Sequence, residues 1–417
     1  MDKKTEELYW ERTRRINKTI SLEIPDRVPI EMAFDYFPAK YVGISFEAAY
    51  YDYDNWLAAY KKAVIDLDPD ALFFLPGFTP GKALEILDPK PFRWPGHGVP
   101  PNKSHQFVEG EWMKADEYDA FIGDHGDYLI RRHLPRVIGA AAPLENFPEF
   151  TSLGYGYFSG MAFAQALAKP EVAEAIEKVI KAGKEIRKWS SKADEFRREI
   201  ISLGCPVNAA GIMQAPFDAI SDFLRGMQGA MIDMFRQPDK LLGATGKILE
   251  TTLVAIERLP PPTEDVNRVF IPLHRGSDGF MSLKQFETFY WPGLKNILLA
   301  LIEAGYTPGI FCEGDWTRRL EYFQELPKGR VLVHFDATDV FKAKEIAGKH
   351  ICIRGNVPSS LLQAGTSDEV KAYCKELIDV VGKDGGLIVC PRSSTDEAKP
   401  ENLKAMIDFT REYGVYN

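Results

Sequence analysis

The sequence predicts an α/β fold, a (β/α)8 TIM barrel, and two observations lead to this prediction. From about residue 266 onward, short apolar runs alternate with helical patterns of about 10–20 residues, which is typical of βαβ units around a parallel sheet. Apolar runs typical of buried strands also occur early, at 28–34 and 71–75, so one closed barrel explains the chain better than two domains. The later strands are predicted at 208–214, 268–273, 307–312, 330–335, 351–354 and 386–390.

Helical patterns and their boundary signals complete this outline. Residues 4–19 form an amphipathic pattern within an N-terminal helical extension, 1–25, and Pro25 blocks its continuation. Thr366, followed three residues later by Glu369, forms a capping box that marks the start of a helix. We therefore interpret the whole chain, 1–417, as a single barrel domain. Helices are predicted at 55–67, 161–168, 170–203, 239–259, 283–304, 316–326, 342–347 and 368–381.

One segment interrupts the regular pattern. Residues 76–125 are rich in proline, glycine and aromatic residues and show no periodicity, which predicts a long loop insertion. Loops of this length in compact chains are usually functional. Two interpretations stay open: a lid over a site, or a surface excursion that is packed by its own aromatic side chains.

Composition and charge exclude several classes of protein. With 51 Lys and Arg against 60 Asp and Glu, the net charge is -9, so the chain lacks the basic surface that binds a phosphate backbone. Five scattered cysteines indicate a reducing compartment rather than a disulfide framework. The charged N-terminus has no apolar signal core, and no run of about 18 apolar residues could span a membrane. These observations predict a soluble cytoplasmic enzyme.

The chemistry of a barrel is expected at the C-terminal ends of its strands. The strand at 307–312 is followed by Glu313, and the next strand, 330–335, carries His334 near its end. A carboxylate and an imidazole from adjacent strands can converge on one metal ion, and zinc accepts both ligands. The structural alternatives are that His334 makes only a structural hydrogen bond and that Glu313 binds a backbone amide or a substrate hydroxyl.

Several segments of the chain resemble the uroporphyrinogen decarboxylase superfamily. The resemblance runs from about Asp26 to Gly414, is strongest over 269–414, and implies a (β/α)8 barrel, in agreement with the alternation of strands and helices. The segments that carry it are Gly-Phe-Met-Ser at 279–282, Glu-Gly-Asp at 313–315, Gly-Asn-Val-Pro at 355–358, Leu-Leu at 361–362, Gly-Thr at 365–366, Gly-Gly-Leu-Ile at 385–388 and Pro-Glu-Asn-Leu-Lys-Ala-Met at 400–406.

Two branches of this superfamily fit the sequence poorly. The decarboxylases hold their acidic substrate with N-terminal arginines, whereas the matching stretch here, 34–40, contains no arginine and carries Asp35. The thiol-methylating branch binds zinc through a His-x-Cys-Gly motif and a late cysteine. Phe311, Glu313 and Ser393 occupy those three positions here, which disfavours transfer to coenzyme M or another thiol.

The sequence looks most like the first methyltransferase of O-demethylase systems, which cleaves methoxylated aromatic compounds. That resemblance implies a zinc site built from Glu313 and His334 as catalytic residues, with His274, Asp336 or Cys390 as the third ligand. Zinc would act as a Lewis acid on the ether oxygen. The methyl acceptor would be the reduced cobalt of a corrinoid (cobalamin) on a separate partner protein. The predicted substrate-binding residues are Tyr36, Gln214, Arg275 and Trp316, with Arg275 on a ring carboxylate and with Phe78, Trp94 and Phe217 as further aromatic walls.

Three other functions stay open at this point. The first is a metal-free lyase acting on a carboxylated ring, with His274 or Asp278 as the acid–base group. The second is a methylcorrinoid:thiol methyltransferase of the coenzyme M type. The third is a non-catalytic docking partner that binds a corrinoid protein without turnover. Dependence on metal and on corrinoid would separate these alternatives.

Overall fold

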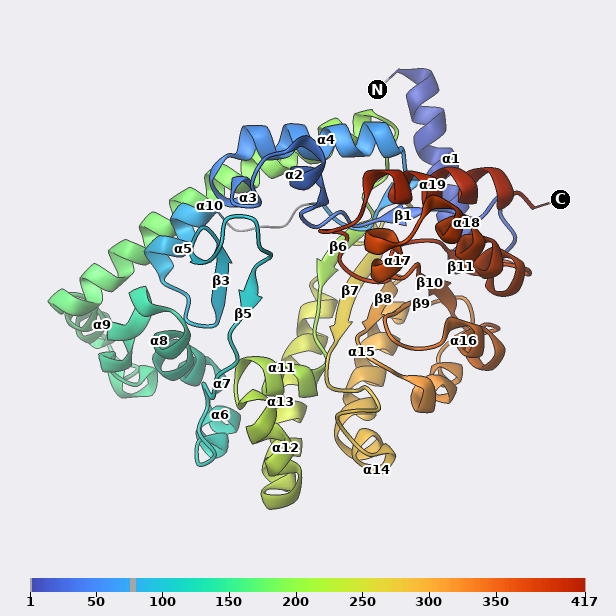
Figure 1. Ribbon diagram of the computed structural model, residues 1–417. Helices are drawn as coiled ribbons and strands as arrows, with labels where there is room; N and C mark the ends of the chain where they lie inside the picture. Colours follow the sequence, from blue (N-terminus) through green and yellow to red (C-terminus); the bar gives the residue numbers. More distant parts are fainter. Residues whose placement is uncertain (1, 76–79, 417) are drawn as a thin grey trace.

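The structure is a computed structural model that describes residues 2–75 and 80–416, and it has an α/β fold (Figure 1). Its main element is a six-stranded parallel sheet in the order β11-β10-β9-β8-β7-β6. The strands of this sheet are β6 (Ala209–Ile212), β7 (Arg268–Leu273), β8 (Thr307–Cys312), β9 (Leu332–Phe335), β10 (Cys352–Arg354) and β11 (Leu387–Ile388).

A two-stranded parallel sheet, β1 (Glu31–Met32) and β2 (Ala71–Leu72), lies between the two edges of the main sheet. One parallel bridge joins Ile30 to Val389, next to β11, and another joins Leu72 to Val207, next to β6. The strand segments thus follow one another in the order that a barrel requires, but single bridges take the place of ladders at two junctions. The described residues form no single closed sheet, so closure of the (β/α)8 barrel stays a prediction.

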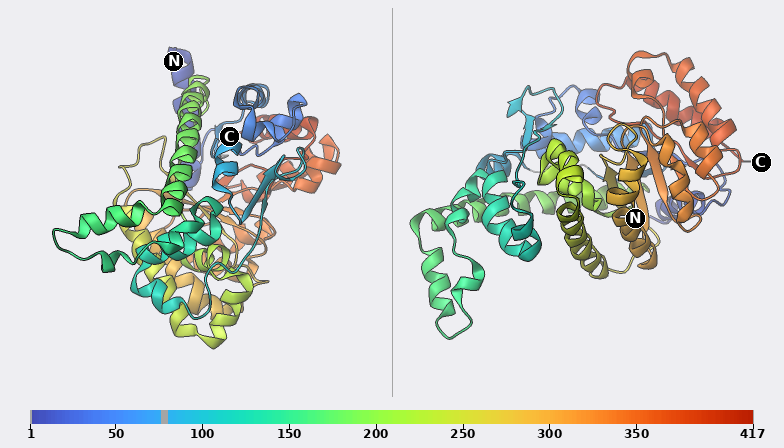
Figure 2. Two further views of the ribbon diagram at one scale, coloured as in Figure 1. Left: turned by 90° about the vertical axis from the view of Figure 1, so that its left-hand side faces the viewer. Right: turned by 90° about the horizontal axis from the view of Figure 1, so that it is seen from below.

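Helices surround the strands, and the longest, α10, crosses the molecule from the α9 region towards the sheet (Figure 1). Figure 2 shows α9 and the segment before it projecting away from the sheet. No helix within residues 2–75 and 80–416 is both long and apolar enough to cross a bilayer. The α-helices are α1 (Lys3–Ile20), α2 (Phe37–Val42), α3 (Ala48–Tyr51), α4 (Tyr53–Leu67), α5 (Gly81–Leu87), α6 (Tyr118–Gly123), α7 (His125–Tyr128), α8 (Leu134–Val137), α9 (Ser159–Leu167), α10 (Pro170–Ser202), α11 (Pro216–Phe223), α12 (Gly226–Arg236), α13 (Pro238–Glu257), α14 (Leu283–Gln285), α15 (Trp291–Glu303), α16 (Val340–Ala347), α17 (Ser359–Ala364), α18 (Ser367–Glu376) and α19 (Pro400–Tyr413).

Most of the predicted elements are present. The bounds of β7 and β8 are the predicted ones, and α1 begins where the Asp2 side chain accepts a hydrogen bond from the Thr5 N–H. The capping box of Thr366 and Glu369 is formed at the start of α18. The helix predicted at 316–326 is instead a 3-10 helix, and α17 and α19 were not predicted. The 3-10 helices are Gly139–Asn146, Phe150–Leu153 and Thr317–Glu325, and π-helical turns occupy Leu129–His133, Phe286–Tyr290 and Leu377–Val381.

The segment 76–125, predicted as a long loop insertion, contains regular elements in the part that the structure describes, which begins at residue 80. This part contains α5, α6 and a three-stranded sheet of β3 (Phe92–Pro95), β4 (Gly98–Val99) and β5 (Gln106–Phe107). Its prolines and its very short strands leave too few consecutive residues for a readable periodicity. The interpretation as an excursion packed by its own aromatics is supported, because Phe92 stacks on Trp94 with 6.1 Å between ring centroids.

Two separate apolar clusters explain why the strands are short continuous apolar runs. Leu332, Cys352 and Ile388, together with Phe73, form a cluster on the inner face of the strands, against which Phe270 packs. The other side chains of the same strands join a much larger cluster beneath the helices. Because both faces of these strands are covered, alternation with polar residues is lost, as expected for parallel sheets.

Candidate functional site

A cavity of about 250 Å³ opens at the C-terminal ends of the strands. Half-buried rings of Phe74, Phe270 and Phe311 form its aromatic walls. Polar groups approach it from β1, β9, β10 and the segment after β11. Its lining residues are Ala33, Asp35, Phe74, Phe270, Phe311, His334, Arg354, Pro391, Ser393 and Ser394. A small, mostly apolar pocket with a few polar groups is typical of a site for one small ligand.

Strand register arranges the polar groups of this region in two levels. Phe311 pairs with His334, and His334 pairs with Arg354, so these three residues lie side by side across β8, β9 and β10. Leu273 pairs with Cys312, which places His274 opposite Glu313 at the next position along the strands. Two residues along a strand correspond to roughly 6.6 Å. Glu313 therefore lies one level above His334 and beside His274.

A buried ion cluster forms the floor beneath the cavity. Glu31 on β1 is 0% exposed and lies between two guanidinium groups, those of Arg268 on β7 and Arg354 on β10. Arg268 Nη1 donates to Glu31 Oε1 at 2.8 Å, and Arg354 Nε lies 2.9 Å from Glu31 Oε2. Both arginine side chains are at least nine-tenths buried. Two buried cations thus share one carboxylate.

His334 is hydrogen-bonded in a way that does not suit a metal ligand. Arg354 Nη1 lies 3.0 Å from His334 Nδ1, and because an arginine only donates, Nδ1 must be the acceptor. Burial and the charge of Arg354 hold the pKa of His334 well below its ordinary value, so the ring is neutral and Nε2 carries its proton. Nε2 lies 3.8 Å from Cys390 Sγ. Neither ring nitrogen offers a lone pair towards Glu313, so the predicted Glu313–His334 zinc pair does not fit this arrangement.

Glu313 instead faces His274. Glu313 Oε2 lies 3.8 Å from His274 Nε2, while His274 Nδ1 lies 2.5 Å from Asp222 Oδ2 on α11. Burial lowers the pKa of His274, but the hydrogen bond to Asp222 and the nearby carboxylates outweigh burial and raise it above the ordinary value. A histidine whose Nδ1–H is held by a carboxylate presents Nε2 as a donor atom, which is the usual support of a metal-binding histidine.

Asp218 on α11 fixes the segment that carries His274. Its two carboxylate oxygens accept the backbone N–H groups of His274 and Arg275, each at 3.0 Å, and it also accepts the Tyr290 hydroxyl at 2.6 Å. Burial and the neighbouring Asp222 raise the pKa of Asp218 to about 6. The orientation of His274 therefore depends on two buried carboxylates, Asp218 and Asp222, neither of which was predicted from the sequence as a site residue.

The three residues predicted as the third zinc ligand do not lie together: Cys390 is beside His334, whereas His274 is beside Glu313. Asp336 accepts the Gly314 N–H at 3.1 Å and Arg392 Nε at 2.9 Å, so its carboxylate is held by these two donors. Cys390 lies beside His334, and burial raises the pKa of its thiol to about 11. Only His274 lies next to Glu313. Within the described part of the chain, no group of three or more His, Cys, Asp or Glu side chains is positioned to hold a metal ion.

The predicted substrate-binding residues need correction. Arg275 is bound by Asp222, with Nη2 3.0 Å from Oδ1, so it is not available for a substrate carboxylate. Trp316 is 0% exposed; it packs against Tyr290 and donates from Nε1 to the Glu313 carbonyl. Tyr36 is buried and hydrogen-bonded to Tyr50 and His105, and Gln214 is half-buried just beyond β6, outside the cavity lining.

Trp94 and Phe217, two of the other aromatic residues predicted as walls, are not among the described residues that line the cavity. Trp94 and Phe217 are each 1% exposed and belong to the large outer cluster, and Phe78 lies outside the described residues. The observed walls, Phe270 and Phe311, could have been found from strand alternation, because they share a strand face with His274 and Glu313. Asp278, the alternative acid–base group, pairs with the buried Arg319 and therefore has a structural role.

Asp35 gives the cavity a pH-dependent charge. Burial and the nearby Asp396 raise the pKa of Asp35 to about 7. The folded protein thus retains a proton that the unfolded chain releases near the ordinary aspartate pKa of 3.8, and stability falls as pH rises through the window from 3.8 to about 7. We expect Asp35→Asn to raise the melting temperature by about 2 °C or more at pH 8 and to have little effect at pH 4.

This prediction is checked by thermal unfolding of the two proteins across that pH range. Asp35 has a φ of 43°, and asparagine tolerates this left-handed conformation as well as aspartate does, so the substitution adds no backbone strain. An equal difference in melting temperature at pH 4 and pH 8 would contradict the shifted pKa.

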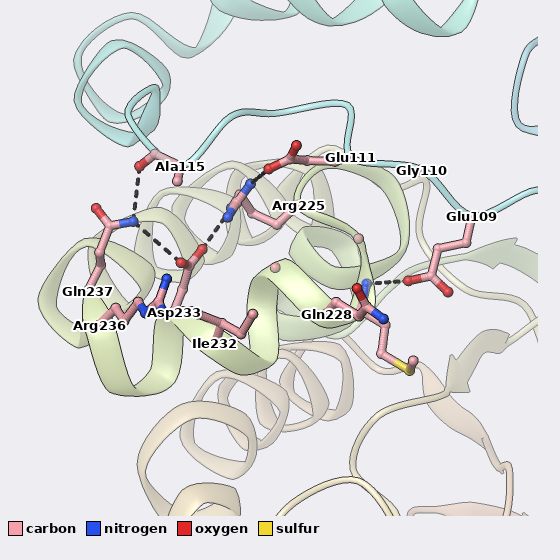
Figure 3. A pocket seen from close by; sticks show the side chains of 13 residues that line it. Glu109, Gly110, Glu111, Ala115, Arg225, Gln228, Ile232, Asp233, Arg236 and Gln237 are labelled. Atoms are coloured by element: carbon pink, nitrogen blue, oxygen red, sulfur yellow. Dashed lines mark hydrogen bonds and ion pairs between the residues drawn. The ribbon is translucent and has the colours of Figure 1, made fainter.

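A larger cavity, about 550 Å³, lies between the segment 109–115 and α12 (Figure 3). Its polar groups are engaged with one another: Arg225 pairs with both Glu111 and Asp233, and Glu109 accepts the Met227 N–H. None of the residues predicted to be catalytic, metal-binding or substrate-binding lines it. The smaller cavity at the strand ends is therefore the candidate active site.

Comparisons with known proteins agree with the fold and the resemblance. The model of the uroporphyrinogen decarboxylase (URO-D) family matches residues 161–413, and the chain belongs to this family. Among solved structures, a methyltransferase from Methanosarcina mazei is similar with a TM-score of 0.61 and 17% identity, over 96% of this chain and 98% of that chain. At this identity the likeness shows the fold alone. No curated protein matches the chain.

Proposed function

We propose that the protein is a methyltransferase that demethylates a methoxylated aromatic compound and passes the methyl group to the reduced cobalt of a corrinoid on a partner protein. The observation that carries this proposal is the aromatic-walled cavity with the His274–Glu313 pair one level above its floor. Family membership and the likeness in fold to a methyltransferase support the same class of reaction.

The chain's own residues would hold and orient the substrate. The rings of Phe74, Phe270 and Phe311 pack against a flat aromatic ring, and their aromatic faces exclude water from it. With the ring in this cavity, a methoxy group that points outward reaches the level of His274 and Glu313. The methyl carbon then faces the open end, where the cobalt of the acceptor supplies the electron pair that takes the methyl group.

The phenolate oxygen that leaves the methyl group must be stabilised near His274 and Glu313. The bond between the methyl carbon and the ether oxygen breaks, and the oxygen leaves as a phenolate, which takes up a proton to become the phenol. Phenolates are poor leaving groups, since the pKa of a phenol is about 10. Glu313 and His274 would supply two of the ligands of a zinc ion, which would polarise the ether oxygen as a Lewis acid. Asp222 keeps His274 in the orientation that this ligation needs.

The activity is tested by mixing the protein with a reduced corrinoid protein and a methoxybenzoate. The expected product is the corresponding phenol, formed together with the methylated corrinoid. Absence of phenol from methoxybenzoates and from neutral methoxyarenes alike would remove the proposed substrate class.

Zinc content gives a separate prediction. We expect about one zinc per chain in the purified protein, lost in a Glu313→Gln/His274→Gln double variant and retained in His334→Gln. The reason is that His274 Nε2 is aimed at Glu313, whereas both ring nitrogens of His334 are otherwise engaged. Elemental analysis of the wild-type protein and the two variants measures the zinc content per chain. Loss of zinc in His334→Gln alone would restore the pair predicted from the sequence.

A metal-free lyase is a second candidate, favoured by the short His274–Asp222 contact, because an imidazole held by a buried carboxylate is suited to acid–base chemistry. It predicts full activity in the presence of a chelator and without corrinoid. The thiol methyltransferase alternative has no comparable support. Cys312 belongs to the outer cluster beneath the helices, and the position of the first motif cysteine is Glu313.

A further inference from the structure

The ion cluster beneath the cavity contains two arginines, Arg268 and Arg354, but one carboxylate, Glu31, and therefore has a net charge of one positive unit. Glu31 is the only carboxylate within hydrogen-bonding distance of Arg268 and Arg354 in the described part of the chain. The other polar side chains beside the two arginines, those of Asn17, Asn208 and His334, are neutral. Buried charges without a partner are costly. This excess cation in a buried position points to an anionic ligand.

Arg354 is the arginine that can meet such a ligand. It lines the cavity, whereas Arg268 does not. Its Nε lies beside Glu31 and its Nη1 beside His334, and within the described residues its Nη2 makes no hydrogen bond. The guanidinium is held in place from two sides and also lies over the Phe73 ring, 4.4 Å from the centroid. It is thus a fixed donor at the bottom of an aromatic pocket.

We propose that Arg354 binds the carboxylate of an aromatic acid whose ring lies between Phe74, Phe270 and Phe311. This proposal rests on the proposed function for the identity of the reaction. It adds the class of substrate, which is a methoxylated aromatic acid rather than a neutral methoxyarene. The carboxylate lies at the level of Arg354 and His334, and the opposite end of the ring points to His274 and Glu313. This assigns to Arg354 the role that was predicted from the sequence for Arg275.

Asp35 makes the binding of such an anion dependent on pH. It lines the same cavity and is close enough to Arg354 for the arginine to lower its pKa, although burial and Asp396 dominate and raise it. The groups that face Asp35 are Asp396, Arg354, Tyr60 and the backbone N–H of Thr395. When Asp35 is protonated it is neutral, and the excess positive charge of Arg354 remains available to pair with the carboxylate of the ligand. Ionised Asp35 competes for it, so an aromatic carboxylate binds more weakly at higher pH.

Calorimetric titration of the full chain with benzoate and with methoxybenzene tests the proposal without any turnover. We expect benzoate to bind more tightly than methoxybenzene to the wild-type protein, and to lose several-fold in affinity from pH 6 to pH 8. Arg354→Met should weaken benzoate about 10–100-fold, the loss of one charge-assisted contact, and should change methoxybenzene less than about threefold. Arg354→Met leaves Glu31 paired with Arg268 alone, a balanced pair, so the variant is expected to fold.

The comparison within the wild-type protein needs no variant and stands even where a variant unfolds. Equal affinity for the two ligands, or unchanged benzoate affinity in Arg354→Met, overturns the proposal. Loss of benzoate binding in Arg275→Met with full binding in Arg354→Met overturns it as well. Failure of the proposed function can be distinguished from failure of this proposal. In the first case benzoate binds through Arg354, but no phenol forms from a methoxybenzoate.

Discussion

Replacement of Glu31 by alanine is expected to lower the free energy of unfolding by about 3–5 kcal/mol, which is typical of breaking a buried ion pair from one side. Glu31 is 0% exposed, and its removal leaves the guanidinium groups of Arg268 and Arg354 close together without a counter-ion. Each arginine is at least nine-tenths buried, so water compensates poorly for the lost carboxylate. Urea denaturation at neutral pH measures the effect as a lower midpoint with an unchanged slope.

A surface glutamate provides the matched control. Glu250 pairs with Lys247 at 3.0 Å, but its side chain is 65% exposed, so Glu250→Ala should change stability by no more than about 0.5 kcal/mol. A Glu31→Ala/Arg354→Met double variant should recover part of the loss, because one of the two uncompensated cations is removed. If Glu31→Ala proves as stable as Glu250→Ala, the buried cluster does not have the charges assigned to it.

The second large effect is expected at Asp222. Asp222→Asn should weaken zinc binding about 10–100-fold, as the loss of a carboxylate behind a ligating histidine usually does, and should slow phenol formation in parallel. Asp222 Oδ2 lies 2.5 Å from His274 Nδ1, and Oδ1 lies 3.0 Å from Arg275 Nη2. An asparagine has one oxygen and can serve only one of these donors, so the orientation of His274 is no longer secured.

The measurement is a competition titration of zinc against a coloured chelator, followed by the rate of phenol formation at fixed zinc concentration. Asp119→Asn is the control, because Asp119 is 75% exposed and pairs with Lys240 on the surface. Its zinc affinity and rate should equal those of the wild-type protein. Unaltered zinc affinity in Asp222→Asn would show that His274 is not a ligand or that Asp222 does not orient it.

The regular elements of the second half of the chain could be predicted because each depends on local patterns. The strands β7 and β8 are apolar runs bounded by turn residues, and the start of α18 carries a capping box that forms as the sequence indicates. The segment after residue 79 could not be predicted in the same way. Its strands of two to four residues are stabilised by aromatic contacts such as Phe92 on Trp94, which no periodicity reveals.

The candidate site shows where prediction from the sequence reached its limit. Glu313 and His334 both lie at strand ends of adjacent strands, as predicted, but the register pairs His334 with Phe311 and leaves Glu313 one level higher. A register shift of two residues along parallel strands moves a side chain by roughly 6.6 Å, which is more than the reach of one metal ion. The sequence contains no signal for that register.

The order of residues alone determined the α/β class, the family, and the set of polar residues that the strand ends carry. Periodicity and turn chemistry act between neighbours in the chain, so they can be read without coordinates. Tertiary structure decided which of those polar groups meet: Asp222 with His274, His274 with Glu313, and Arg354 with Glu31 and His334. These contacts join residues that are 20 or more positions apart, and only the packing of strands against one another and against α11 brings them within hydrogen-bonding or ionic distance.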